Sequence, residues 1–257
     1  MESPYKKSEL YQPKTISANI HDIIDSNLYA HKQLLEKVNL VAKYINPTST
    51  LLDLGCGNGA TLAYFQGKAG TLLGVDFSER FVEFANAQFA QGYSNIQFFT
   101  SDICNSFELP SLVDCAYSFS CLYYITDFSG FCTSLSNHIR PNGIAILDLG
   151  NKRSLNTFCC RYYEREDGYA QNTADKIEKQ MAILHDAGFD VLEHRSFQFL
   201  PLWAGKPKFL WPLLHPKWND WLKVRWRGRM LDEWLSSAPM LWRLAFRHLV
   251  VCQKRGN

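Results

Sequence analysis

The stretch from Thr50 to Ala60, TLLDLGCGNGA, constrains the fold more than any other part of the chain. It begins with a short apolar run, containing Leu51, Leu52 and Leu54, of the kind that forms a buried parallel strand. Glycines then follow at positions 55, 57 and 59. Because glycine adopts positive φ and lets a ligand approach the backbone closely, the stretch predicts a strand, a tight turn and a helix that begins at Ala60.

A second apolar strand, Thr71 to Val75, follows this predicted helix and is succeeded by Asp76. An acid about 20 residues after a glycine turn is well placed to accept hydrogen bonds from a ribose diol. The two strands therefore predict a β-α-β unit that binds a nucleoside. The glycines run G-x-G-x-G, whereas the dinucleotide fingerprint is G-x-G-x-x-G, so the spacing argues against a nicotinamide cofactor.

The segment DLGCGNG, residues 53–59, resembles motif I of the Rossmann-like S-adenosylmethionine (SAM)-dependent methyltransferases. The resemblance implies that Asp53 helps to hold the methionine end of SAM. It also implies that Asp102, after the third strand, meets the adenine amino group while Ile103 packs on the ring. The cofactor-binding residues expected on this basis are Asp53, Gly55, Cys56, Gly57, Asp76, Phe77, Asp102, Ile103 and Ser118.

Two further segments extend the resemblance over about residues 28 to 150. Leu122-Tyr123-Tyr124 loosely matches a leucine followed by two aromatic or histidine residues. The phrase from Ile139 to Ile144 is similar to the leucine-(lysine or arginine)-proline-glycine turn of the family. The fold that this implies is α/β: a doubly wound, seven-stranded, mostly parallel sheet with an antiparallel last strand and a helical insertion between strands six and seven.

Periodicity and turn residues place the other elements. Strands are expected at 95–100, 112–119, 144–149, 189–199 and 246–252, and helices within 21–45 and at 78–87, 128–138 and 174–187. Residues 151–173 are polar and aromatic without a clean period, in a place where the family inserts substrate-binding elements. We expect an N-terminal arm and helical cap at 1–45 and a methyltransferase domain at 46–257.

The predicted insertion, residues 200–245, is the most individual part of the chain. It holds all seven tryptophans together with eight lysines and arginines against three acids, in a chain whose net charge is only +2. Tryptophan with basic side chains suits a membrane interface, stacking on a flat substrate or an anionic ligand. The alternative is a helical cover whose tryptophans pack on the sheet while Arg225, Arg227, Arg229 and the other cations stay solvated.

Composition and charge exclude several other classes. The hydrophobic share of 46% indicates a globular chain, and no apolar run approaches the ~20 residues of a membrane-spanning helix. The polar N-terminus lacks the pattern of a secretory signal, so a cytoplasmic location is expected. The low net charge argues against nucleic acid, and the eight cysteines form no C-x-x-C pair, so no metal is expected.

The function that these features predict is transfer of a methyl group from SAM to an O, N or C nucleophile of a small-molecule, glycan or lipid-linked acceptor. Such an enzyme mainly supplies alignment, and a general base helps a hydroxyl or amine nucleophile. The catalytic candidates are Tyr123, Tyr124 and His194, with Asp127 and His215 as further possible bases. The alternatives are a non-catalytic SAM- or nucleoside-binding module and an RNA or protein methyltransferase. Peripheral membrane contact through 200–245 is a further expectation.

Overall fold

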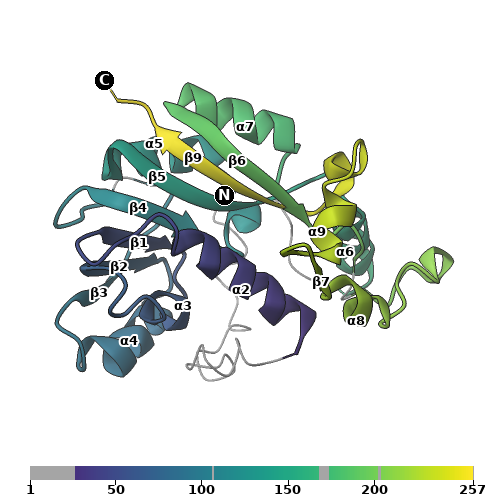
Figure 1. Cartoon of the computed structure of the whole chain (residues 1–257), viewed down its shortest axis with the longest axis horizontal. Helices are drawn as coiled ribbons and strands as arrows, with labels where there is room; N and C mark the ends of the chain where they lie inside the picture. Colours follow the sequence, from purple (N-terminus) through teal and green to yellow (C-terminus); the bar gives the residue numbers. More distant parts are fainter. Residues whose placement is uncertain (1–26, 106, 168–173, 202–203, 257) are drawn as a thin grey trace.

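In the computed structural model, seven strands form one sheet in the order β3-β2-β1-β4-β5-β9-β6 (Figure 1). The structure describes residues 27–105, 107–167, 174–201 and 204–256. The predicted N-terminal arm, Trp203 and part of the 151–173 segment therefore lie outside the described residues. The first five strands are parallel, and β9 runs antiparallel between β5 and β6. The predicted seven-stranded, mostly parallel sheet with an antiparallel last strand is confirmed.

The strands lie close to their predicted positions. They are β1 (Thr50–Leu54), β2 (Thr71–Asp76), β3 (Ile96–Thr100), β4 (Val113–Ser118), β5 (Ile139–Gly150), β6 (Phe189–Phe197) and β9 (Arg247–Lys254). All five residues of β1 are buried, as expected for a strand in the middle of a parallel sheet. The turn expected at 140–143 falls within β5, where the pairing with β4 shifts register and Asn142 has a φ of 63°.

Helices cover both faces of the sheet, so the core has two halves. On one face lie α2 (Tyr29–Val41), α3 (Ala60–Ala63) and α4 (Glu79–Ala85), the last followed by a π-helical turn, Asn86–Ala90. On the other lie α5 (Phe128–His138) and α7 (Ile177–Asp186). Successive side chains of a strand point to opposite faces of the sheet, so alternate strand residues enter different halves of the core. Each helix turns its apolar residues toward the strands.

One helix was not anticipated from the sequence. Residues 155–167, within the segment without a clean period, form α6 (Leu155–Asp167). Asn151 and Ser154 anchor its start: the Thr157 backbone N–H donates to the Ser154 hydroxyl, and the Thr157 hydroxyl donates to the Asn151 carbonyl. Polar side chains that bond the backbone therefore fix this helix, and an apolar stripe does not reveal them.

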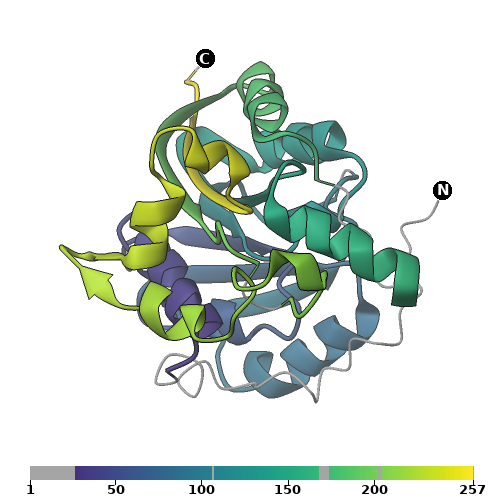
Figure 2. The same ribbon diagram turned by 90° about the vertical axis from the view of Figure 1, so that its right-hand side faces the viewer.

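The insertion between β6 and β9 is less helical than the sequence suggests. It contains two short helices, α8 (Trp218–Leu222) and α9 (Leu231–Ser236), with a two-stranded hairpin of β7 (Arg225–Trp226) and β8 (Arg229–Met230) between them. Short 3-10 turns occupy Lys208–Leu210 and Leu241–Leu244. In Figure 2, α2, α6 and the insertion surround one edge of the sheet.

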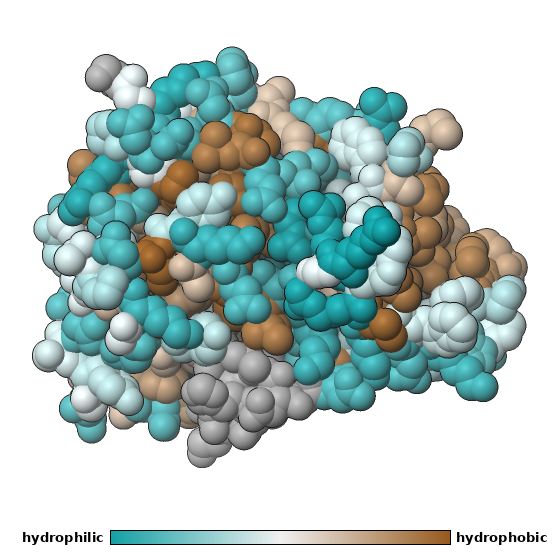
Figure 3. All heavy atoms as spheres, in the orientation of Figure 1, coloured by the Kyte–Doolittle hydropathy of each residue, from teal (hydrophilic) through white to brown (hydrophobic). Residues whose placement is uncertain are grey.

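That edge is the one where the parallel strands end, and ligands bind there in open α/β sheets. In the space-filling view, apolar residues gather at the right-hand end of the molecule, over the insertion (Figure 3). Within the described ranges, every helix is too short or too polar to cross a bilayer.

Candidate functional site

The glycine turn after β1 has the backbone shape that its sequence predicts. Gly55, Gly57 and Gly59 all have positive φ, between 51° and 79°. A Cβ at Gly55 would lie 2.5 Å from the Cys121 sulfur, and one at Gly59 would lie 2.7 Å from the Phe98 ring. A Cβ at Gly57 would meet nothing within 4 Å. Packing therefore requires the outer two glycines, whereas the middle one faces open space at the carboxyl edge of the sheet.

Asp53 is a buried acid just before this turn. Its carboxylate accepts a 2.8 Å hydrogen bond from the hydroxyl of Tyr117 on the neighbouring strand β4. Burial raises the pKa of Asp53 to about 8, against the lowering effect of the Tyr117 hydrogen bond. Burial makes ionisation of this carboxyl group unfavourable, and a nearby positive charge would make it favourable again. Asp53 is therefore suited to a positively charged ligand.

Asp76 ends β2 and braces the same turn. One carboxylate oxygen accepts the backbone N–H of Gly57 at 2.9 Å, and the other accepts that of Ser78 at 2.9 Å. Burial raises the pKa of Asp76, and these two hydrogen bonds oppose the rise. The next residue, Phe77, keeps an exposed ring. A ligand that places hydroxyl groups here would have the Asp76 carboxylate and the Phe77 ring beside it.

The remaining predicted cofactor residues differ in what they contact. Asp102 and Ile103 follow β3, where the Asp102 carboxylate accepts the backbone N–H of Cys104 and Ile103 is buried. Ser118 is fully buried and donates its hydroxyl to the Leu54 carbonyl, which ties β4 to β1. Cys56 is buried in the turn, and its backbone N–H donates to the Val75 carbonyl. In this structure, Ser118 and Cys56 shape the turn through its backbone.

A buried group of charges lies at the ends of β4 and β5, and the sequence did not single it out. We call Lys37, Asp148 and Arg247 the cation cluster. The Asp148 carboxylate contacts the Lys37 ammonium at 2.6 Å and the Arg247 guanidinium at 2.5 Å, and it accepts the Ser120 backbone N–H at 3.1 Å. Two cations around one carboxylate leave the cluster with a net positive charge.

Burial sets the titration of the cation cluster. Burial lowers the pKa of Lys37 to about 8, although Asp148 opposes the shift. Burial by itself raises the pKa of Asp148, but the charges of Arg247 and Lys37 outweigh it and hold that pKa below its usual range. The other Asp148 oxygen, Oδ1, is buried and has no hydrogen-bond partner. Near neutral pH, Lys37 is thus the member of the cluster that exchanges a proton most readily.

The cluster connects the turn to the predicted catalytic tyrosines. The Phe119 ring lies beside Tyr117, with ring centroids 4.7 Å apart, and the Lys37 ammonium lies 5.6 Å from the Phe119 ring centre. At the other end, Arg247 donates to the Tyr123 hydroxyl at 3.1 Å. Tyr123 packs edge-on against Tyr124, which is only partly buried. Asp53, the cation cluster and both tyrosines thus belong to one continuous region.

The three histidine and aspartate candidates lie apart from this region. His194 pairs with Val250, whose side chain enters the core on the α5–α7 face, opposite to α2. Its Nε2 is 2.8 Å from Nδ1 of His248, and burial lowers the pKa of both rings, that of His248 to about 3. Asp127 caps α5 by accepting the Gly130 N–H, and His215 lies in the insertion.

Comparisons with known proteins agree with this geometry. Residues 51–143 match the family model described as a methyltransferase domain. The fold around this segment is that of the Rossmann-like SAM-dependent methyltransferases. A sequence search among curated proteins finds no match. Among the described residues, no three histidine, cysteine, aspartate or glutamate side chains are grouped so as to hold a metal ion.

Solved structures share the fold of the methyltransferase domain across most of the chain. A SAM-dependent methyltransferase from Mesorhizobium loti is similar at a TM-score of 0.59 with 16% identity, covering 90% of this chain and 100% of that one. The N-methyltransferase NodS from Bradyrhizobium japonicum WM9, in complex with S-adenosylhomocysteine, gives 0.57 and 16%, covering 90% of each. Magnesium protoporphyrin IX methyltransferase from Synechocystis PCC 6803, with the same product bound, gives 0.54 and 18%, covering 87% and 83%.

Replacing Asp76 with alanine is expected to weaken SAM binding by about tenfold or more. A carboxylate that accepts ribose hydroxyls makes charge-assisted hydrogen bonds, each worth roughly 1.5–3 kcal/mol. The substitution also removes the acceptor of the Gly57 N–H. Titration calorimetry of the variant and the parent measures the effect, and equal affinities would remove Asp76 from the site.

The affinity for SAM is expected to rise with pH up to about 8. Asp53 holds a proton below its raised pKa, and a cationic ligand favours the ionised form, so binding releases that proton. One released proton gives at most about a tenfold gain per pH unit. Calorimetry between about pH 6 and about pH 8 measures the slope. In Asp53→Asn only the titration of the ligand itself contributes to the pH dependence of SAM affinity. If this variant showed the same slope as the parent, the role of Asp53 would be contradicted.

Proposed function

We propose that the protein transfers the methyl group of SAM to an O, N or C nucleophile of a small-molecule, glycan or lipid-linked acceptor. One observation carries the proposal: the glycine turn and the cation cluster lie on the same face of the sheet, at the carboxyl ends of neighbouring strands. Asp53, Tyr117 and Phe119 form a line between them. A cofactor on the turn would direct its methyl group toward the cluster.

The residues around the turn fit SAM. The open space at Gly57 leaves room for a ligand against the backbone. The groups that act on the buried acid Asp53 are Tyr117 and Asp76, neither of which is a cation, so Asp53 suits the positively charged methionine end. Asp76 suits the ribose, and Phe77, Asp102 and Ile103 suit the adenine. Bound SAM would supply an electrophilic methyl group on a sulfonium, a leaving group that needs no further activation.

The acceptor end contributes positioning and a place for a proton. Arg247 holds the Tyr123 hydroxyl and Asp148 together, so Tyr123 and the cation cluster form one rigid polar wall. In this proposal Lys37 takes the proton of a hydroxyl or amine nucleophile when it is in its neutral form, which burial favours by lowering its pKa to about 8. Tyr123 and Tyr124 position the acceptor. His194, on the opposite face of the sheet, is the weakest of the three catalytic candidates.

The chain division also belongs to the proposal. Residues 1–45 form an N-terminal arm and cap, and 46–257 form the methyltransferase domain. Lys37 lies on the cap helix α2, so the cap completes the acceptor end. The insertion at 200–245 covers the acceptor side and gives the protein its peripheral membrane contact. The proposal includes a cytoplasmic location and an acceptor other than nucleic acid.

Transfer of label from methyl-labelled SAM tests the proposed function. The protein is incubated with cell extracts fractionated into lipid, glycan, small-molecule, RNA and protein pools. We expect label in the lipid, glycan or small-molecule pool. Label in RNA or protein alone would support that alternative class instead. SAM binding without label in any pool would support a non-catalytic module.

A further inference from the structure

The tip of the insertion carries large apolar side chains that the protein leaves in solvent. Phe209, Trp211 and Trp221 are 71%, 53% and 67% exposed, and Leu213 and Trp218 are exposed as well. We call these five residues, with Lys208 and Lys217, the tryptophan surface. Figure 3 shows apolar residues at this end of the molecule. An exposed apolar patch of this kind marks a docking site in a soluble protein.

The tryptophan surface is built around an open groove. The groove has a volume of about 360 Å³ and is lined by Pro212, His215, Lys217, Trp218 and Trp221. The Trp218 indole N–H donates to the Pro212 carbonyl at 3.1 Å, and the Trp211 ring lies 4.8 Å from that of His215. These contacts hold the rings while their apolar faces stay outside, so the surface is pre-formed.

The positive charge beside the groove is available to a partner. Lys208 and Lys217 are exposed, and neither makes an ion pair with a carboxylate among the described residues. The nearby acid Asp220 is already paired with Lys223 at 2.8 Å. The tip therefore presents indole rings flanked by uncompensated cations.

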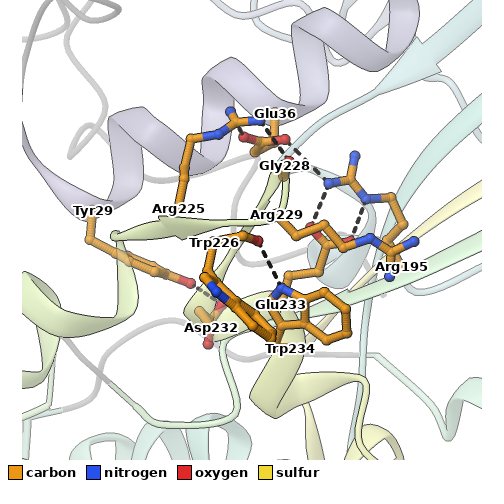
Figure 4. Close-up of polar contacts among 10 residues, drawn as sticks. All are labelled: Tyr29, Glu36, Arg195, Arg225, Trp226, Gly228, Arg229, Asp232, Glu233 and Trp234. Atoms are coloured by element: carbon orange, nitrogen blue, oxygen red, sulfur yellow. Dashed lines mark hydrogen bonds and ion pairs between the residues drawn. The ribbon is translucent and has the colours of Figure 1, made fainter.

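Other cations of the insertion serve a different purpose, which Figure 4 shows. Arg225 pairs with Glu36 of α2, and Arg229 lies 3.5 Å from Glu233 of α9. Glu233 also receives two hydrogen bonds, at 2.8 and 2.5 Å, from Arg195 of β6. Arg227, by contrast, makes no ion pair among the described residues.

A second buried contact completes the attachment. The Tyr29 hydroxyl of α2 donates to Asp232 of α9 at 2.5 Å, and the Gln198 backbone N–H donates to the same carboxylate at 2.7 Å. Buried bonds to both α2 and β6 thus fix the base of the insertion. The tip is consequently held at a fixed place relative to the acceptor end of the site.

We propose that the tryptophan surface docks on a membrane that contains anionic lipids. Indole rings settle at the level of lipid headgroups, and lysines beside them are attracted to anionic headgroups. Exposed indole rings beside unpaired lysines match the chemistry of an anionic bilayer surface. The inference rests on the proposed function for its purpose, which is to bring a lipid-linked acceptor to the cation cluster.

Vesicle flotation with the full-length protein tests the proposal. The vesicles are phosphatidylcholine alone, or equal parts of phosphatidylcholine and phosphatidylglycerol. We expect binding to the mixed vesicles and little to the neutral ones. Lys208→Gln/Lys217→Gln should lower the affinity roughly 25-fold, since each cation contributes about fivefold near an anionic surface. Phe209→Ser/Trp221→Ser should abolish binding to the mixed vesicles.

Matched control variants separate this surface from general effects. Lys43→Gln/Lys152→Gln removes two exposed charges elsewhere, and Tyr93→Ser removes an aromatic side chain that is 50% exposed on the body. Both should bind vesicles like the parent. All variants should keep the SAM affinity of the parent.

Three results would overturn the proposal. The first is that the parent does not float with mixed vesicles. The second is that the charge and aromatic variants bind as well as their controls. The third is that Phe209→Ser/Trp221→Ser turns a dimeric parent into a monomer, because a second copy would then cover the surface. If the parent floats with the mixed vesicles but does not bind SAM, that result would contradict the proposed function and leave the docking surface in place.

Discussion

Replacing Gly57 with valine is expected to weaken SAM binding by at least about a hundredfold while the fold survives. A Cβ at this position points into open space, so no protein atom opposes the substitution. The added branch would instead occupy the place where the cofactor meets the backbone. Valine also resists the φ of 51° at this position, which costs roughly 1–3 kcal/mol of stability. Titration calorimetry gives the affinity, and urea unfolding gives the stability.

Gly188→Val is the matched control. Gly188 follows α7, has a φ of 93° and likewise has nothing within 4 Å of an added Cβ. It shares the backbone strain of Gly57 but lies far along the chain from the glycine turn. The control should lose a similar amount of stability and keep its SAM affinity. If both variants bound SAM equally well, Gly57 would be only a structural glycine and the cofactor assignment would fail.

Replacing Asp148 with asparagine is expected to lower the free energy of unfolding by roughly 3–5 kcal/mol. The side chain keeps its shape but loses the charge that compensates Lys37, which is buried, and Arg247, whose side chain is 14% exposed. Their desolvation is then no longer offset by an opposite charge. Methyl transfer should fall as well, because Arg247 would no longer be held between Asp148 and Tyr123. Urea unfolding measures the first effect, and transfer of label measures the second.

Asp190→Asn provides the comparison. Its carboxylate pairs with Arg255 at 3.1 Å, but both side chains are about half exposed, so removing the charge should cost less than about 1 kcal/mol. Transfer should be unchanged in this variant. A stability loss for Asp148→Asn no greater than that for Asp190→Asn would show that the cation cluster is not a buried electrostatic unit.

The geometry of the glycine turn was predictable because its residues are close together in the sequence. Asp53, the three glycines and Asp76 lie within two neighbouring strands and one turn, so spacing alone fixes their meeting. The structure adds what spacing does not contain. It shows that Gly55 and Gly59 serve packing against Cys121 and Phe98, and that Gly57 alone faces outward.

The cation cluster was not predictable in the same way. Lys37 and Asp148 are 111 positions apart, and Arg247 follows Asp148 by a further 99. No local period joins them, and each taken alone resembles an ordinary helix or strand residue. The signal that was present is a charged residue within an apolar run: Asp148 stands in the strand sequence IAILDLG, and Lys37 in a helix with Val38 and Val41 in the core.

The histidine and arginine candidates show the same limit. Side chains along β6 alternate between the two faces of the sheet, so His194 lies on one of them. The sequence alone does not say whether that face is the one covered by α2. Arg225 and Arg229 belong to a basic segment. Arg229 pairs with Glu233 inside that segment, but Arg225 pairs with Glu36, which lies outside it and nearly 200 residues earlier. Net charge counted over a segment therefore overstated the charge available to a partner.

Calorimetric titration of the parent protein with SAM and, separately, with NAD⁺ tests which of the two nucleoside ligands the glycine turn binds. The glycine spacing, the open face of Gly57, and the acids Asp53 and Asp76 predict a dissociation constant for SAM on the order of micromolar, equivalent to about −8 kcal/mol. They predict no measurable binding of NAD⁺. Binding of NAD⁺ in place of SAM, or no binding of SAM at all, would contradict the account.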